Sequence, residues 1–109
     1  MGRKGAKLTS QATDVAVQLA ERLSPLGDVS TRKMFGGYGI FESKSMFALV
    51  TSEGVAHLKV DDSNVDKFVK ADAKKFGRMP YYEIPDSVFS NTRSLRSWAK
   101  QSIAINKKA

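Results

Sequence analysis

The chain has 109 residues, a net charge of +7 and no cysteine. This length suffices for one domain with its own core, because a domain of this size buries roughly two-thirds of the surface of its unfolded chain. The lack of cysteine excludes disulfides, thiolate catalysis and cysteine-ligated zinc, and it agrees with a cytoplasmic location. The longest apolar run, residues 46–50, is too short to cross a bilayer, so no membrane association is expected.

Much of the positive charge lies near the two ends of the chain. We expect residues 1–9 to form a flexible basic tail and residues 10–109 to form a single domain. Without the five terminal cations the net charge falls from +7 to +2, so the body is expected to be only mildly basic. A surface of solvated charges is the simpler interpretation, and a phosphate-binding patch is the alternative. The five cations are Arg3, Lys4, Lys7, Lys107 and Lys108.

A first helix is predicted over about residues 10–24. Thr9 or Ser10 can cap its first amides, and Pro25 with Gly27 can end it. Apolar residues recur at intervals of three and four and form one stripe along the helix. The stripe consists of Val15, Ala16, Leu19, Ala20, Leu23 and Leu26.

Four strands are predicted next, over about residues 29–35, 37–42, 45–51 and 55–61. Aromatic and β-branched residues dominate these stretches, and glycine or polar residues separate them, as in hairpins. Their alternation indicates an antiparallel sheet with one covered face and one wetter face. We expect the helix-covered face to carry Phe35, Tyr38, Ile40, Phe47, Leu49, Leu58 and Val60.

A short second helix and a last strand follow. Ser63 and Asp66 approximate a capping box for the helix, which ends near residue 71. Residues 81–84 resemble a strand, and the flanking Pro80 and Pro85 place it at an edge.

The final helix carries the clearest signals. Asn91 or Thr92 can cap it, and apolar positions spaced at i, i+3, i+4, i+7 and i+8 form one buried face. That face consists of Leu95, Trp98, Ala99, Ser102 and Ile103. The whole pattern predicts a two-layer α+β fold of order α-β-β-β-β-α-β-α, with helices on one face of an antiparallel sheet.

The most distinctive local string runs from Phe35 through Gly36, Gly37 and Tyr38 to Gly39. Phosphate loops lead from a strand into a helix, whereas strand-forming residues continue on both sides of this string. We therefore interpret it as a tight β-connection, in which glycine supplies a positive φ.

No catalytic, metal or cofactor site can be assembled from the ionisable residues. His57 is the only histidine and has no partner at triad or metal-ligand spacing, so a packing or surface role is expected. Asp61 and Asp62 come directly before a predicted helix, where the free backbone amides of the first turn stabilise carboxylates. The glutamates are scattered, and no pair is spaced for acid–base work. The sequence thus predicts a non-enzymatic protein.

A partner or nucleic-acid surface is the remaining class of site. Six cations would form one if the fold brings them together: Arg32, Lys33, Lys59, Lys74, Lys75 and Arg78. Tyr81 and Tyr82 should point to opposite faces of one strand, which would leave one of them facing a partner. Trp98 is expected to be core.

Several strings, in this order, resemble the TfoX N-terminal-domain family over about residues 10–105. They are RKMFGGYGIF at 32–41, MFALV at 46–50, LKVDD at 58–62, PYYEIP at 80–85 and SWA at 97–99. The resemblance implies the α+β arrangement predicted above and supplies no catalytic residues. Longer members carry a second, helical domain, which does not follow the last helix here.

The resemblance implies a bacterial regulator of competence and DNA-transformation genes that acts with the cyclic-AMP receptor protein. Our leading hypothesis is a protein-binding module whose partner is such a regulator or the transcription machinery. Sequence-tolerant nucleic-acid binding is the second hypothesis. The third is a small-ligand carrier or enzyme that uses the glycine turn with a glutamate or His57. A homodimer is also open, because an exposed sheet edge can pair with a second copy.

Overall fold

The computed structural model describes residues 10–34 and 36–107. The chain contains a five-stranded sheet and four α-helices, with one short 3-10 helix, among these residues. The strands are β1 (Val29–Met34), β2 (Gly37–Glu42), β3 (Ser45–Val50), β4 (Ala56–Lys59) and β5 (Tyr81–Glu83). The helices are α1 (Ser10–Leu23), the 3-10 helix η1 (Ser24–Leu26), α2 (Val65–Lys70), α3 (Asp86–Phe89) and α4 (Thr92–Ile105).

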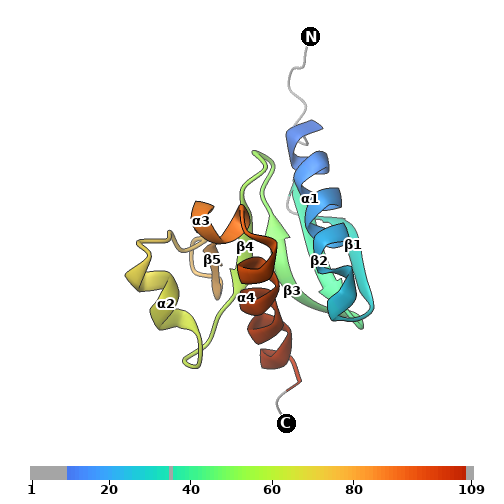
Figure 1. Cartoon of the computed structure of the whole chain (residues 1–109). Helices are drawn as coiled ribbons and strands as arrows, with labels where there is room; N and C mark the ends of the chain where they lie inside the picture. The colour runs from blue at the N-terminus through green and yellow to red at the C-terminus, as the bar shows by residue number, and fades with distance from the viewer. Residues whose placement is uncertain (1–9, 35, 108–109) are drawn as a thin grey trace.

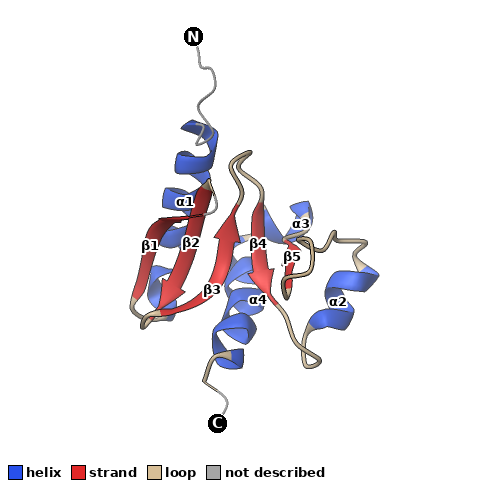
Figure 2. Ribbon diagram, turned by 180° about the vertical axis from the view of Figure 1, so that it is seen from behind, coloured by secondary structure: helices blue, strands red, loops and turns tan. Residues whose placement is uncertain are grey.

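The sheet has the order β1-β2-β3-β4-β5, and every neighbouring pair is antiparallel. Helices α1 and α4 pack against the same face of this sheet and lie in front of it in Figure 1. Figure 2 shows the opposite face, which has no helix in front of it. The predicted two-layer α+β class, with helices on one face, is confirmed. As its flanking prolines indicate, β5 is a terminal strand of the sheet.

The core lies between the helices and the sheet. Helix α1 contributes Ala12, Ala16, Leu19 and Leu23, which recur every three or four residues and are fully buried. Helix α4 begins as predicted, because the side-chain oxygen of Asn91 accepts a hydrogen bond from the Ser94 amide at 3.0 Å. Its buried side chains are Leu95, Ala99, Ser102 and Ile103.

The region around α2 and α3 differs from the prediction in two respects. No side chain caps α2: the Ser63 hydroxyl donates to the Asp61 carboxylate instead, and Asn64 precedes the helix. The capping box at 63–66 is therefore wrong, because the Asp61 side chain engages Ser63 in a local turn. Helix α3 was not predicted, since its four residues are too few for a helical periodicity.

A β-bulge changes which residues of β3 face the helices. Ile40 pairs with Ala48, but the next pair is Phe41 with Met46, so Phe47 is an extra residue on β3. Ala48 therefore lies in the core with α1 and α4. Leu49 instead points to the opposite face, which corrects its predicted place on the helix-covered side.

Some of the expectations fall on residues that the structure does not describe. Phe35, Thr9 and the tail at 1–9 lie outside the described residues. No helix within the described part of the chain is long and apolar enough to cross a membrane.

Candidate functional site

One row of side chains crosses the helix-free face of the sheet. Strand register places Arg32, Gly39, Leu49, His57 and Glu83 opposite one another on consecutive strands. Their sequence neighbours in β2, β3 and β4 belong to the helix-side core, so by alternation this row faces away from α1 and α4. The row begins with a cation on β1 and ends with a carboxylate on β5.

The β4–β5 end of this face is covered by the segment before β5. The ring of Phe76 meets the His57 imidazole edge-on, with centroids 5.2 Å apart. His57 is only 4% exposed, and its Nδ1 lies 3.1 Å from the Val55 carbonyl oxygen. Burial lowers the pKa of His57, against the opposing effects of that hydrogen bond and of the Glu83 charge. His57 is thus a packed side chain whose burial favours the neutral ring.

The part of the face over β1, β2 and β3 carries an apolar cluster. A Cβ atom on Gly39 would lie within 3 Å of Met34 Sδ, Met46 Sδ and Phe41 Cε1. The missing side chain of Gly39 therefore lets three larger side chains close over the strand. The Arg32 guanidinium carbon lies 4.8 Å from the centroid of the Phe41 ring. We call Arg32, Met34, Phe41 and Met46 the methionine patch.

Sequence reasoning did not single out Met34, Phe41 and Met46. Side-chain alternation in β1 and β2 is the signal that places Met34 and Phe41 on the face of Arg32. Met46 escapes that signal, because its orientation depends on the bulge between β2 and β3.

The glycine string forms the predicted tight β-connection. Met34 pairs with Gly37, so the chain reverses between these two residues, and Gly36 has φ of +74°. Next to it, a Cβ on Gly37 would lie 2.0 Å from the Val50 carbonyl oxygen. The glycines thus serve the turn and the close approach of β2 to β3. Tyr38, on the helix side, bonds through its hydroxyl to Thr13 Oγ1 at 2.9 Å.

The fold divides the six predicted surface cations among three places. Arg32 and Lys33 lie on β1, at one edge of the sheet. Lys74, Lys75 and Arg78 lie in the segment beside β5, at the opposite edge. Between these edges, the Nζ of Lys59 donates to Asn106 Oδ1 at 2.6 Å. The fold does not bring these side chains into one surface.

The sequence analysis counts Lys107 among the terminal cations outside the body, but the structure places it in the folded domain. Its Nζ lies 3.1 Å from Oε1 of Glu42, a buried side chain at the end of β2. A cation beyond the last helix is thus part of the folded body.

The three aromatic residues that the sequence analysis singled out, Tyr81, Tyr82 and Trp98, all pack against other parts of the domain. Tyr81 is buried on the helix-free side, its hydroxyl lies 3.4 Å from the Met46 carbonyl oxygen, and burial raises its pKa to about 12. Tyr82 is half-buried on the other side, 5.9 Å from the Phe68 ring. Trp98 is half-buried against the core, and its ring meets that of Phe68 edge-on at 4.7 Å.

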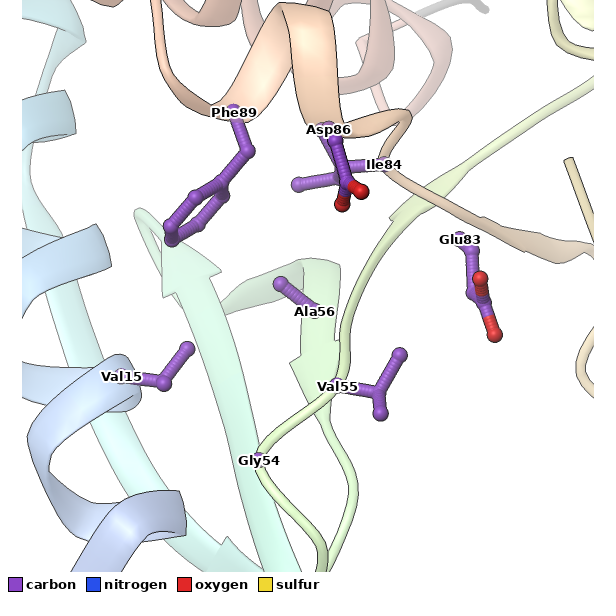
Figure 3. Close-up of a pocket in the computed structure, with 8 residues that line it drawn as sticks. All are labelled: Val15, Gly54, Val55, Ala56, Glu83, Ile84, Asp86 and Phe89. Atoms are coloured by element: carbon purple, nitrogen blue, oxygen red, sulfur yellow. The ribbon is translucent and has the colours of Figure 1, made fainter. Parts of the chain in front are cut away.

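A cleft of about 190 Å³ opens between α1, the β3–β4 turn and α3. The Asp86 carboxylate and the Phe89 ring point into it, and Val15 and Ala56 form apolar walls, whereas the Glu83 carboxylate lies to one side (Figure 3). This volume is below the roughly 300 Å³ at which ligand pockets usually begin. Among the described residues that line it, the ionisable side chains are these two carboxylates, and no histidine, lysine or serine stands beside them. The remaining lining residues are Gly54, Val55 and Ile84.

Two further clefts, of about 230 and 180 Å³, lie beside α2 and beside the β2–β3 turn. None of the three is lined by the glycine turn at 36–39 or by His57. Over residues 10–34 and 36–107, no three histidine, aspartate or glutamate side chains are grouped so that they could hold a metal ion.

Comparison with known families gives a match to the TfoX N-terminal domain over residues 21–105. The matched segment begins inside α1 and includes every strand, the methionine patch and α4. A comparison with curated proteins found no match. Because the family match covers most of the 109 residues, the chain belongs to the TfoX N-terminal domain family.

Proposed function

We propose that this domain is a non-enzymatic regulatory module that binds a protein partner through the methionine patch. The observation that carries the proposal is a sheet face without a helix, on which Met34, Phe41 and Met46 gather around Gly39. Methionine side chains are unbranched and polarisable, and such side chains are common on surfaces that adapt to a protein partner. The clefts among the described residues are small for ligand pockets, which favours surface binding over catalysis.

The chemistry of the patch suggests the chemistry of the partner. Arg32 is exposed and lies over the ring of Phe41, which is buried beside the half-buried Met34 and Met46, so a cation stands over a partly covered apolar cluster. Lys33 adds a second positive charge on the same strand. A partner segment with apolar side chains and a carboxylate would complement this surface, because opposite charges favour encounter and fix orientation.

Family membership gives the proposal its biological setting. We place the domain in the bacterial cytoplasm, in the regulation of transcription and of competence for DNA transformation. A cyclic-AMP-receptor-type regulator is the first partner to test, and a component of the transcription machinery is the next. The proposal assigns no cofactor and no metal to the domain.

The test is isothermal titration calorimetry of the domain with a purified cyclic-AMP-receptor-type regulator from the same host. Arg32→Glu and Met46→Ser should each weaken binding by roughly tenfold or more, because both change the centre of the proposed interface. Lys100→Glu is the matched control, since this exposed lysine lies on α4, on the helix side of the sheet. If the unmodified domain and all three variants bind with equal affinity, the proposed surface is contradicted. No binding by the regulator or by RNA polymerase subunits would contradict the proposed function.

Nucleic-acid binding is the second candidate function. It is favoured by Lys74, Lys75 and Arg78, three cations within one short segment beside β5. Fluorescence anisotropy with a labelled duplex should then give an affinity that falls steeply with salt. Neutralising these three residues should reduce the salt dependence, and an affinity unchanged by both salt and these substitutions would exclude the idea.

A further inference from the structure

The two edges of the sheet differ in how they are covered. At β5 the segment 74–76 runs alongside the strand: the Phe76 amide donates to the Tyr81 carbonyl, and the Glu83 amide donates to the Lys74 carbonyl, both at 2.8 Å. At β1 no segment of the described chain lies beyond the strand (Figure 2). The β1 edge therefore keeps a row of backbone groups available for pairing.

Hydrogen bonding fixes which residues of β1 point outward. The Ser43 amide donates to the Asp28 carbonyl at 3.0 Å. The backbone N–H and C=O groups of every second residue after Asp28 therefore also point toward β2. Val29, Thr31 and Lys33 consequently turn their backbone groups away from the sheet. The Val29 amide already bonds to the Gly27 carbonyl, whereas both backbone groups of Thr31, at the centre of the strand, point away from β2.

The helix beside this edge presents an apolar side chain in the same direction. Val17 and Val69 are the exposed large apolar residues among those described, and Val17 is 50% exposed. Thr13, one turn before Val17 on α1, bonds to Tyr38 on β2, whereas Arg22 reaches from the other flank of α1 to Thr92 on α4. Val17 thus lies on the flank of α1 that overhangs β1.

We infer that two copies of this chain pair through β1, antiparallel, with Thr31 of one copy opposite Thr31 of the second copy. A two-fold axis through this pair also brings the two α1 flanks together, so that Val17 of each copy is covered. Both features are needed, because a stable interface generally buries about 1,200 Å² or more. The inference rests on the β1 edge and does not depend on the proposed protein partner.

Charge disfavours one of the two neighbouring registers. With Thr31 opposite Thr31, Arg32 faces Ser30 and Met34 faces Asp28 of the second copy. The register one step along would place Arg32 opposite Arg32, and like charges directly opposite each other destabilise a pair of strands. The Arg32 guanidinium also lies over its own Phe41 ring, toward β2 and away from the axis.

Pairing would extend the helix-free face from one copy to the other. The two methionine patches would then lie on one continuous surface related by a two-fold axis. A partner would meet two equivalent patches, and occupation of both would strengthen binding through effective concentration.

The test is sedimentation-velocity analysis of the whole chain from micromolar to millimolar concentration. The unmodified chain should show a reversible monomer–dimer equilibrium. Thr31→Lys and Thr31→Glu should each raise the dimer dissociation constant by roughly tenfold, because each places like charges opposite each other at the axis. Mixing these two variants should restore dimers, since lysine then faces glutamate. Circular dichroism of each variant should match that of the unmodified chain, because Thr31 is exposed in the monomer.

Val17→Asp should weaken the dimer, and Val69→Asp is its matched control on α2. A chain that stays monomeric at millimolar concentration would overturn the inference and would make the β1 cations a device against pairing. A dimer that persists in both Thr31 variants, or mixed variants that do not associate, would overturn the register.

Discussion

The Nζ of Lys107 lies 3.1 Å from Oε1 of Glu42, so an ion pair joins the turn after α4 to the end of β2. Lys107 is largely exposed, whereas the Glu42 side chain is buried. The same carboxylate accepts hydrogen bonds from the Ser43 hydroxyl at 2.8 Å and from the Asp28 amide at 3.2 Å. One glutamate thus holds together the chain entering β1, the β2–β3 turn and the turn after α4.

This site makes stability depend on pH. The hydrogen bond from Ser43, followed by that from Lys107, lowers the pKa of Glu42 below the ordinary value of 4.5. The carboxylate therefore stabilises the fold above pH 4.5, and this contribution is lost as the pH falls through the folded-state pKa. We expect Glu42→Gln to reduce the free energy of unfolding at neutral pH and the loss to shrink in acid. Urea unfolding at several pH values measures this, and a loss independent of pH would contradict it.

His57 provides a second pH prediction. Burial lowers its pKa below 6.5, so the folded state prefers the neutral ring. The resulting stability is present above pH 6.5 and declines as the pH falls toward the folded-state pKa. Because the chain has one histidine, an NMR titration of the ring proton is unambiguous. A midpoint at or above 6.5 would mean that Phe76 does not cover the ring.

Lys44 should tolerate a stabilising substitution. Ser43 and Lys44 form the two-residue turn between β2 and β3, with φ of +51° and +79°. A left-handed conformation costs a residue with a side chain roughly 1 kcal/mol relative to glycine. Lys44→Gly should therefore raise the free energy of unfolding by about that amount. Lys44→Ala, which also removes the charge but keeps a Cβ, should give no such gain in the same urea titration.

Two glycines of β2 should differ in their tolerance of alanine. The nearest obstacle to a Cβ on Gly39 is a methionine sulfur at 2.6 Å, which a flexible side chain can withdraw. The obstacle at Gly37 is the Val50 carbonyl oxygen, which is held in the sheet. We expect Gly39→Ala to cost about 1 kcal/mol and Gly37→Ala about 3 kcal/mol or more. Similar losses at both positions would contradict the close approach of β2 to β3.

Much of the fold could be predicted from local patterns. The sequence pattern places α1 within a residue of both its observed ends and α4 at its observed start, because each helix buries a stripe of its own residues. Strand alternation likewise places β1 to β4. The orientation of Leu49 could not be predicted, since it depends on the bulge between two strands. Helix α3 follows a proline and is too short for a periodic signal.

The candidate site was less predictable than the fold. Sequence reasoning selected cations, but their grouping depends on strand order, which puts Arg32 and Lys75 at opposite edges. The methionine patch arises from cross-strand register around Gly39, and no local pattern contains that register. The uncovered β1 edge is likewise a property of the assembled sheet.

The most direct test of the proposed docking surface is methyl NMR of the methionines during titration with a purified cyclic-AMP-receptor-type regulator. Met34 and Met46 lie in the patch, whereas Met79 lies beside β5 and serves as an internal reference. We predict that the methyl signals of Met34 and Met46 shift or broaden while that of Met79 stays in place. Binding that moves the Met79 signal and leaves Met34 and Met46 unchanged would contradict the account.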